Sequence, residues 1–142
     1  MWSERPACLD TNVAIYAFTG HGAKAAAARA VLRAADFISV QLLNEFANVM
    51  VRKQGRPWSE VKLALERICR AVPRVLPLDI EAHSAGMKIF EQYRLSIYDS
   101  LMLGVALTGG ARTFYSEDMQ HGMAIFENLR VVNPFLPGAL DT

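Results

Sequence analysis

The chain has 142 residues, of which 52% are hydrophobic and 20% are charged. These proportions exclude a disordered chain and suit one domain, spanning residues 1–142, with a substantial core. The formal net charge of +1 gives no electrostatic argument for or against a nucleic-acid partner.

The cysteine content and the hydropathy bear on where the protein works. Cys8 and Cys69 are the two cysteines, too few for a disulfide framework or a cysteine-rich zinc site, and we expect two buried thiols in a reducing environment. The N-terminus lacks the basic and apolar regions of a signal peptide. No apolar run approaches the roughly 20 residues that span a bilayer. The sequence therefore predicts a cytoplasmic protein without a membrane partner.

The chain opens with a short apolar run at residues 7–9 that predicts a buried strand. Asp10, Thr11 and Asn12 follow as a turn into an amphipathic helix at 13–18, with Asn12 as its expected N-cap. A cap requires neither Asp10 nor Thr11, and a carboxylate after the first strand lies where α/β sheets bind ligands.

Helical and strand-like patterns alternate through the rest of the chain. Ser59, Asp79 and Ser96 are expected N-caps, whereas Gly55, Pro57 and the pair at 109–110 are expected to end helices. The predicted helices are 23–35, 42–50, 59–72, 79–93 and 96–107, and the predicted strands are 37–40, 74–78, 113–115 and 131–132. This alternation predicts right-handed crossovers and a three-layer α/β/α sandwich around a central, mainly parallel sheet.

Four acidic residues occur where the surrounding pattern does not require them. Asp10 and Asp118 follow predicted strands, while Glu45 and Asp99 lie on helices beside apolar residues. Each also has a structural interpretation: Asp10 as a loop residue, Glu45 as an exposed helix edge, Asp99 as a capping-box acid with Ser96, and Asp118 as a first-turn acid after Ser116. Both interpretations stay open for these residues.

The topology would bring the four acids to one edge of the sheet. Carboxylates at short range repel one another and stay ionised together only with cations. Hard divalent cations with oxygen ligands, Mg²⁺ or Mn²⁺, suit such a cluster. Sites of this kind bind phosphate-bearing substrates and activate water for in-line displacement.

The motifs in their order resemble the PIN-domain ribonucleases, and most closely the VapC-type toxins of type II toxin–antitoxin pairs. The resemblance extends over essentially the whole chain and rests on the sequence Leu-Asp-Thr-Asn at 9–12, Asn-Glu at 44–45, Tyr-Asp at 98–99, Ser-Glu-Asp-Met-Gln-His-Gly at 116–122 and Val-Val-Asn-Pro-Phe at 131–135.

The resemblance implies an Mg²⁺- or Mn²⁺-dependent endoribonuclease that uses a water nucleophile. The acidic quartet would be Asp10, Glu45, Asp99 and Asp118, with Glu117 as an alternative at the last position. Supporting hydrogen bonds would come from Thr11, Asn12 and Ser116. The resemblance also implies an antitoxin partner that blocks the acidic site, and a homodimer.

The sequence leaves two other functions open. One is a catalytically silent binding protein on the same fold, with its acids retained for structure. The other is a phosphatase-like hydrolase with Asp10 as nucleophile, which Asn12 disfavours because that class typically has a second aspartate at this position.

Residues outside the acidic motifs give weaker indications of a functional role. His121 is close enough in sequence to Asp118 to shuttle a proton, although a loop histidine is the simpler interpretation. A basic group at the end of the third helix would guide RNA or be a solvated helix end; it comprises Arg52, Lys53 and Arg56. Four aromatic residues suit either an interface or the core: Trp2, Trp58, Phe90 and Tyr93.

Overall fold

The computed structural model describes residues 5–140, and the expectation for Trp2 lies outside them. The helices are α1 (Thr11–Thr19), α2 (Gly22–Ala34), α3 (Val40–Asn48), the π-helix η1 (Val49–Lys53), α4 (Trp58–Ala71), α5 (Ile80–Tyr93) and α6 (Ile97–Thr108). The strands are β1 (Ala7–Leu9), β2 (Ile38–Ser39), β3 (Val75–Leu76), β4 (Thr113–Tyr115), β5 (Ala124–Ile125) and β6 (Leu129–Val132).

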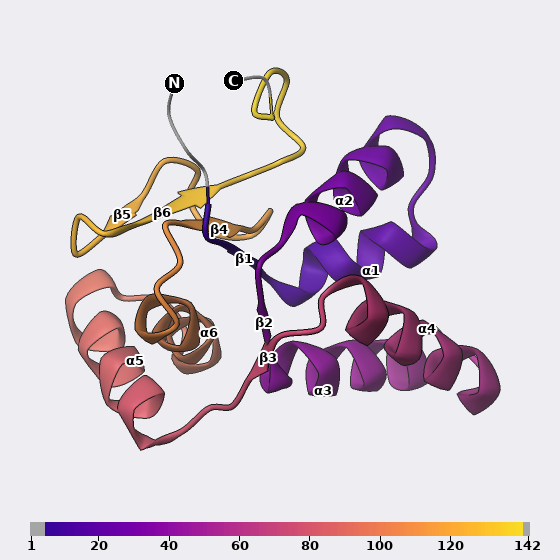
Figure 1. Cartoon of the computed structure of the whole chain (residues 1–142), viewed down its shortest axis with the longest axis horizontal. Coiled ribbons are helices and arrows are strands. Elements are labelled where there is room, and N and C mark those ends of the chain that lie inside the picture. The colour runs from indigo at the N-terminus through magenta and orange to yellow at the C-terminus, as the bar shows by residue number, and fades with distance from the viewer. Residues whose placement is uncertain (1–4, 141–142) are drawn as a thin grey trace.

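The predicted α/β architecture with a mainly parallel central sheet is confirmed. Strands pair in the order β1-β4-β6-β5, and only the β5–β6 pair is antiparallel. Strands β2 and β3 form a separate parallel pair, which joins β1 through backbone N–H groups of Asp36 and Phe37 that donate to the Ala7 carbonyl. Figure 1 shows α5 and α6 on one side of β1, β2 and β3, with α1 to α4 on the other.

Burial of the strand side chains explains why the sheet forms the middle layer. All three residues of β1 and of β4 are buried, as two-sided coverage by helices requires. Phe37, Phe46 and Phe114 are among the largest side chains that are fully buried. The carboxyl ends of β1 and β4 are consequently fixed beside each other, in the parallel register Leu9 with Tyr115.

Of the four predicted N-caps, the structure confirms two and contradicts two. The Asp79 carboxylate accepts the backbone N–H of Ala82, and the Ser96 hydroxyl accepts that of Asp99, which confirms both caps. The prediction of an Asn12 cap is wrong, because Asp10 caps α1 and accepts the backbone N–H of Thr11. The prediction of a Ser59 cap is also wrong: α4 begins at Trp58, after Pro57.

Three other sequence expectations differ from the structure. The strand predicted at 37–40 is shorter, because Ser39 caps α3 and the helix begins at Val40. The helix at 42–50 does not end in a plain α-turn but continues as η1, which reaches Lys53 before Gly55. Cys8 is buried as expected, but Cys69 lies on the outer face of α4 and is exposed, so the expectation of two buried thiols is wrong for Cys69.

Strand β5 and its hairpin with β6 were not predicted from the sequence. The turn between the strands contains Phe126 and Glu127, whose φ angles are 49° and 65°. Glycine and asparagine normally supply such positive φ values, so Phe-Glu gave no turn signal. Tertiary contacts with Tyr93 hold the turn: its hydroxyl accepts the Phe126 N–H at 2.8 Å, and the two rings stack edge-on at 5.4 Å.

Within residues 5–140, no helix has the length and apolarity needed to cross a membrane.

Candidate active site

Asp10 lies at the centre of a hydrogen-bonded network where β1 ends. Its Oδ1 accepts the Thr11 backbone N–H at 2.7 Å, and its Oδ2 accepts the Ser116 hydroxyl at 2.9 Å. Asn12 donates to the same Oδ2 at 3.4 Å. Asp10 is only 6% exposed, and Ser116 is fully buried after β4. The parallel pairing of β1 with β4 therefore holds the Asp10 carboxylate beside Ser116, the residue that follows β4.

Asn12 connects Asp10 to the loop that follows β4. Its amide nitrogen donates to Oδ2 of Asp118 at 3.1 Å, and its amide oxygen accepts the Glu117 backbone N–H at 3.3 Å. One amide thus bridges two carboxylates and orients the backbone of the loop. This contact across 106 positions of sequence explains why the Asn12 side chain does not cap α1.

Glu45 reaches the same region from α3. Thr11 donates its hydroxyl to Oε2 of Glu45 at 2.8 Å, and Gln41 donates to Oε1 at 3.1 Å. Glu45 is half-buried rather than an exposed helix edge. Gln41 was not predicted as a site residue, although its i, i+4 spacing to Glu45 on one helix indicated this support.

Asp99 lies in the first turn of α6, where Ser96 accepts its backbone N–H at 3.1 Å. The side chain is half-buried, and burial together with the charges of Asp118 and Glu45 raises its pKa. Asp99 therefore lies within electrostatic reach of the other acids. Within residues 5–140, none of the four acids forms an ion pair with a lysine, an arginine or a histidine.

The two neighbouring acids at 117 and 118 have different surroundings. Glu117 forms an ion pair with Lys24 at 2.6 Å and accepts the Tyr16 hydroxyl at 2.6 Å. The Lys24 ammonium also lies 3.8 Å from the centre of the Tyr16 ring. Lys24 and Tyr16 lower the pKa of Glu117 despite its partial burial. Glu117 is thus already neutralised by a cation, whereas Asp118 is exposed beside the unpaired acids.

The electrostatic surroundings of Asp10 suit a carboxylate that binds a cation. Burial is the main factor that raises the pKa of Asp10 to about 7; the charges of Asp99 and Glu45 add to it, and hydrogen bonds from Ser116 and Thr11 oppose it. A buried carboxylate with only neutral donors around it lacks a counter-charge. Hard carboxylate oxygens are the donor type that Mg²⁺ and Mn²⁺ prefer. In the described part of the chain, however, no three acidic, histidine or cysteine side chains form a ready-made ion cluster.

This raised pKa makes the stability of the metal-free protein depend on pH. The unfolded pKa of an aspartate is about 3.9, so the favourable contribution of Asp10 is fully present below about pH 4 and is lost as the pH rises through about 7. The loss is on the order of 4 kcal/mol. We expect Asp10→Asn to melt at a higher temperature than the wild type in EDTA at pH 8, and the difference to fall below half at pH 5.

Differential scanning fluorimetry across this pH range would measure the effect. Asp118→Asn is the matched control, because Asp118 is exposed and its replacement should leave the melting temperature nearly unchanged. A wild type as stable as Asp10→Asn at pH 8 would show that Asp10 carries no such electrostatic cost.

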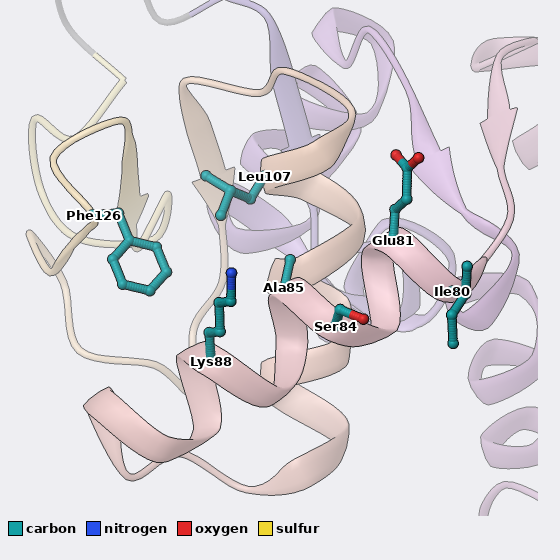
Figure 2. Close-up of a pocket in the computed structure, with 7 residues that line it drawn as sticks. All are labelled: Ile80, Glu81, Ser84, Ala85, Lys88, Leu107 and Phe126. Carbon is teal, nitrogen blue, oxygen red and sulfur yellow. The ribbon is translucent and has the colours of Figure 1, made fainter.

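The remaining candidates lie elsewhere or have structural contacts. His121 is exposed, and its Nδ1 accepts the Asn133 backbone N–H at 3.0 Å, which ties the loop after β4 to the end of β6. Trp58 is 59% exposed and Phe90 is 41% exposed. A separate hollow lies between α5 and the turn after β5 (Figure 2). Lys88 and Phe126 are among the residues that line it, and none of the four acids does.

Fold and site together define a class: α/β proteins that carry a carboxylate-rich site at the carboxyl edge of a parallel sheet. The chain belongs to the PIN-domain family, whose sequence model matches residues 7–123. No curated protein matches the sequence.

Solved structures with this fold include toxin–antitoxin proteins. A toxin–antitoxin complex from Klebsiella pneumoniae is 20% identical, with a TM-score of 0.68 over 91% of this chain and 98% of that chain. VapC20 of Mycobacterium tuberculosis, a toxin that cleaves the sarcin–ricin loop, is 17% identical, with a TM-score of 0.62 over 79% and 89% of the two chains. VapBC2 from Rickettsia felis, solved with a fragment of its promoter DNA, is 16% identical, with a TM-score of 0.64 over 88% and 96%. At these identities the likeness establishes the fold.

Proposed function

We propose that the protein is a metal-dependent endoribonuclease and the toxin of a toxin–antitoxin pair. The observation that carries the proposal is the buried, unpaired Asp10 carboxylate, which shares its surroundings with Glu45, Asp99 and Asp118. Membership of the PIN-domain family and the likeness to VapC-type toxins support the same reaction class.

The four acids would hold Mg²⁺ or Mn²⁺, which when bound screens phosphate charge and makes a water molecule more acidic. The chain supplies the orientation of these acids. The Thr11 hydroxyl fixes the Glu45 carboxylate, the Ser116 hydroxyl fixes that of Asp10, and the Asn12 amide holds Asp10 and Asp118 together. Such supporting contacts fix the carboxylates that bind a metal, and their loss typically costs 10–100-fold in affinity or activity.

Asp118 rather than Glu117 is the acid we assign to the fourth position. Glu117 already has Lys24 and Tyr16 as partners, so it has less negative charge to offer a cation. The Lys24–Glu117 pair instead anchors the loop that carries Asp118.

The biological setting follows from the same proposal. As a toxin, the protein would act in the cytoplasm, where its RNA substrate is found, and a cognate antitoxin would cover the acidic site. A homodimer fits this family, and exposed Trp58 and Phe90 are available to an interface. Tyr93 is not, because its ring and hydroxyl already pack against Phe126.

The experiment that tests the function is cleavage of a mixed cellular RNA pool by the purified, antitoxin-free protein. Incubation with Mg²⁺ or Mn²⁺ is expected to yield discrete fragments that sequencing can place, and EDTA is expected to prevent them. An intact pool under every metal condition would count against the proposal.

A second candidate is a catalytically silent binding protein with the same fold. The observation in its favour is that the acids of residues 5–140 do not form a ready-made ion cluster. Thermal unfolding separates the two candidates: Mn²⁺ should raise the melting temperature of the nuclease by several degrees in a manner that Asp10→Asn and Asp99→Asn remove. A silent protein should show no such shift.

A further inference from the structure

A groove of about 500 Å³ opens directly beside the candidate active site. It lies where α3, the segment between β3 and α5, and the start of α6 meet. Its lining residues are Val40, Gln41, Asn44, Glu45, Asn48, Pro77, Leu78 and Tyr98. Because Glu45 belongs to the acidic group and Tyr98 precedes Asp99, the groove is continuous with the site.

Tyr98 is the aromatic side chain among the residues that line the groove. It is 70% exposed, although the ring is large and its neighbour Asp99 is half-buried. Val40 and Leu78 add apolar surface and are 39% and 38% exposed. An exposed aromatic ring in a groove with apolar neighbours offers a flat face for stacking another ring.

Three amide side chains line the α3 wall at a helical spacing. Gln41, Asn44 and Asn48 are three and four positions apart, which places them along one face. Gln41 is bound to Glu45, but the amides of Asn44 and Asn48 have no hydrogen-bond partner within residues 5–140. Each such amide offers both donors and an acceptor, the combination that reads the edge of a base.

The same helix continues beyond the groove into cationic residues. Arg52 and Lys53 form the last turn of η1, and both are exposed. Along this one continuous helix the chain presents Glu45, then Asn48, then two positive charges. This order suits a nucleic-acid strand whose next phosphates lie against Arg52 and Lys53.

We propose that this groove binds one unpaired nucleobase of the RNA strand, adjacent to the phosphate at the acidic site. Tyr98 stacks on the base, and Asn44 and Asn48 bond to its edge. The inference rests on the proposed nuclease function and adds its substrate class: single-stranded RNA, with preference set at one base. A duplex fits poorly, because its bases are already stacked and paired.

Binding is measured by fluorescence anisotropy with a labelled 10-nucleotide single-stranded RNA of mixed sequence. Asp99→Asn in Mg²⁺ serves as the background, so that the probe stays intact. Stacking on an aromatic side chain predicts that Tyr98→Ala weakens binding by about 10-fold. Tyr98→Phe keeps the ring and should bind within about twofold of the background. Leu63→Ala removes an exposed apolar side chain of α4 outside the groove and should have no effect.

Two further probes separate the base from the backbone. A strand of equal length without bases should bind equally with and without Tyr98→Ala. For homopolymers of A, C and U, the ratio between the weakest and the tightest Kd measures the preference for a base. Asn44→Ala and Asn48→Ala should lower this ratio by about fivefold. An equal loss on the base-free strand, or no loss with Tyr98→Ala, would overturn the inference.

Light scattering and cleavage complete the test. If Tyr98→Ala changed the molar mass of the protein in parallel with RNA binding, the groove would be a contact between copies, and the inference would fail. RNA cleavage by the chain with native Asp99 that is indifferent to Tyr98 would also overturn the inference alone. Binding that depends on Tyr98 without any metal-dependent cleavage would instead overturn the nuclease function and leave an RNA-binding groove.

Discussion

Replacing Asp99 by asparagine is expected to lower the rate of metal-dependent RNA cleavage by at least about 100-fold, while the protein stays folded. Asp99 lies at the start of α6, half-buried among Glu45 and Asp118, and it pairs with no cation in residues 5–140. Removing its charge removes one of the ligands proposed to hold the metal. The amide has nearly the same shape, and the Ser96 cap uses the backbone N–H of residue 99 rather than its side chain.

The measurement is the initial rate of fragment formation from a defined RNA at saturating Mn²⁺, beside melting temperatures in EDTA. Glu91→Gln is the matched control, since Glu91 is an exposed acid on α5 away from the site. It should cleave at the wild-type rate. A normal rate for Asp99→Asn, with unchanged dependence on metal, would remove Asp99 from the site.

Replacing Gly104 by alanine is expected to cost about 3 kcal/mol of folding free energy and to lower the melting temperature by roughly 10 °C. Gly104 of α6 lies where the backbone of α5 comes close to it. A Cβ there would lie 2.4 Å from the Ala82 carbonyl oxygen and 2.8 Å from the Gly86 nitrogen. Both are backbone atoms, so no side-chain rotation relieves the overlap and the two helices must separate.

Urea unfolding followed by circular dichroism would measure the loss. Ser84→Ala alters an exposed position of α5 and should change stability by less than about 0.5 kcal/mol. Because α6 carries Asp99, separating the two helices should move Asp99 away from the other acids and should also lower the rate of cleavage. A Gly104→Ala protein with wild-type stability would show that the α5–α6 contact is looser than the structure has it.

The predictions that agree with the structure depend on neighbours in sequence. The run at 7–9 and the strand at 113–115 are apolar stretches bounded by polar residues, and both form buried strands. Asp79 and Ser96 cap their helices because each side chain reaches a backbone N–H three positions later. Such interactions are local, so a single sequence reveals them.

Competition between local and distant partners explains the errors. Asn12 is an ordinary capping residue by type, but its amide bonds to Asp118 and Glu117, and Asp10 takes the cap. The turn at 126–127 lacks a glycine, and Tyr93 holds it from another element. Nothing within a few residues of either position signals these contacts.

The sequence by itself therefore determined the α/β class, the main helices and strands, and which acids lie out of pattern. Only the tertiary structure decided how those acids differ: Asp10 is buried without a counter-charge, while Lys24 from α2 neutralises Glu117 and leaves Asp118 exposed. It also placed Tyr98 beside Asn44 and Asn48 in one groove. Local propensity sets where an element begins, whereas charge pairing and groove formation depend on residues that only the folded chain brings together.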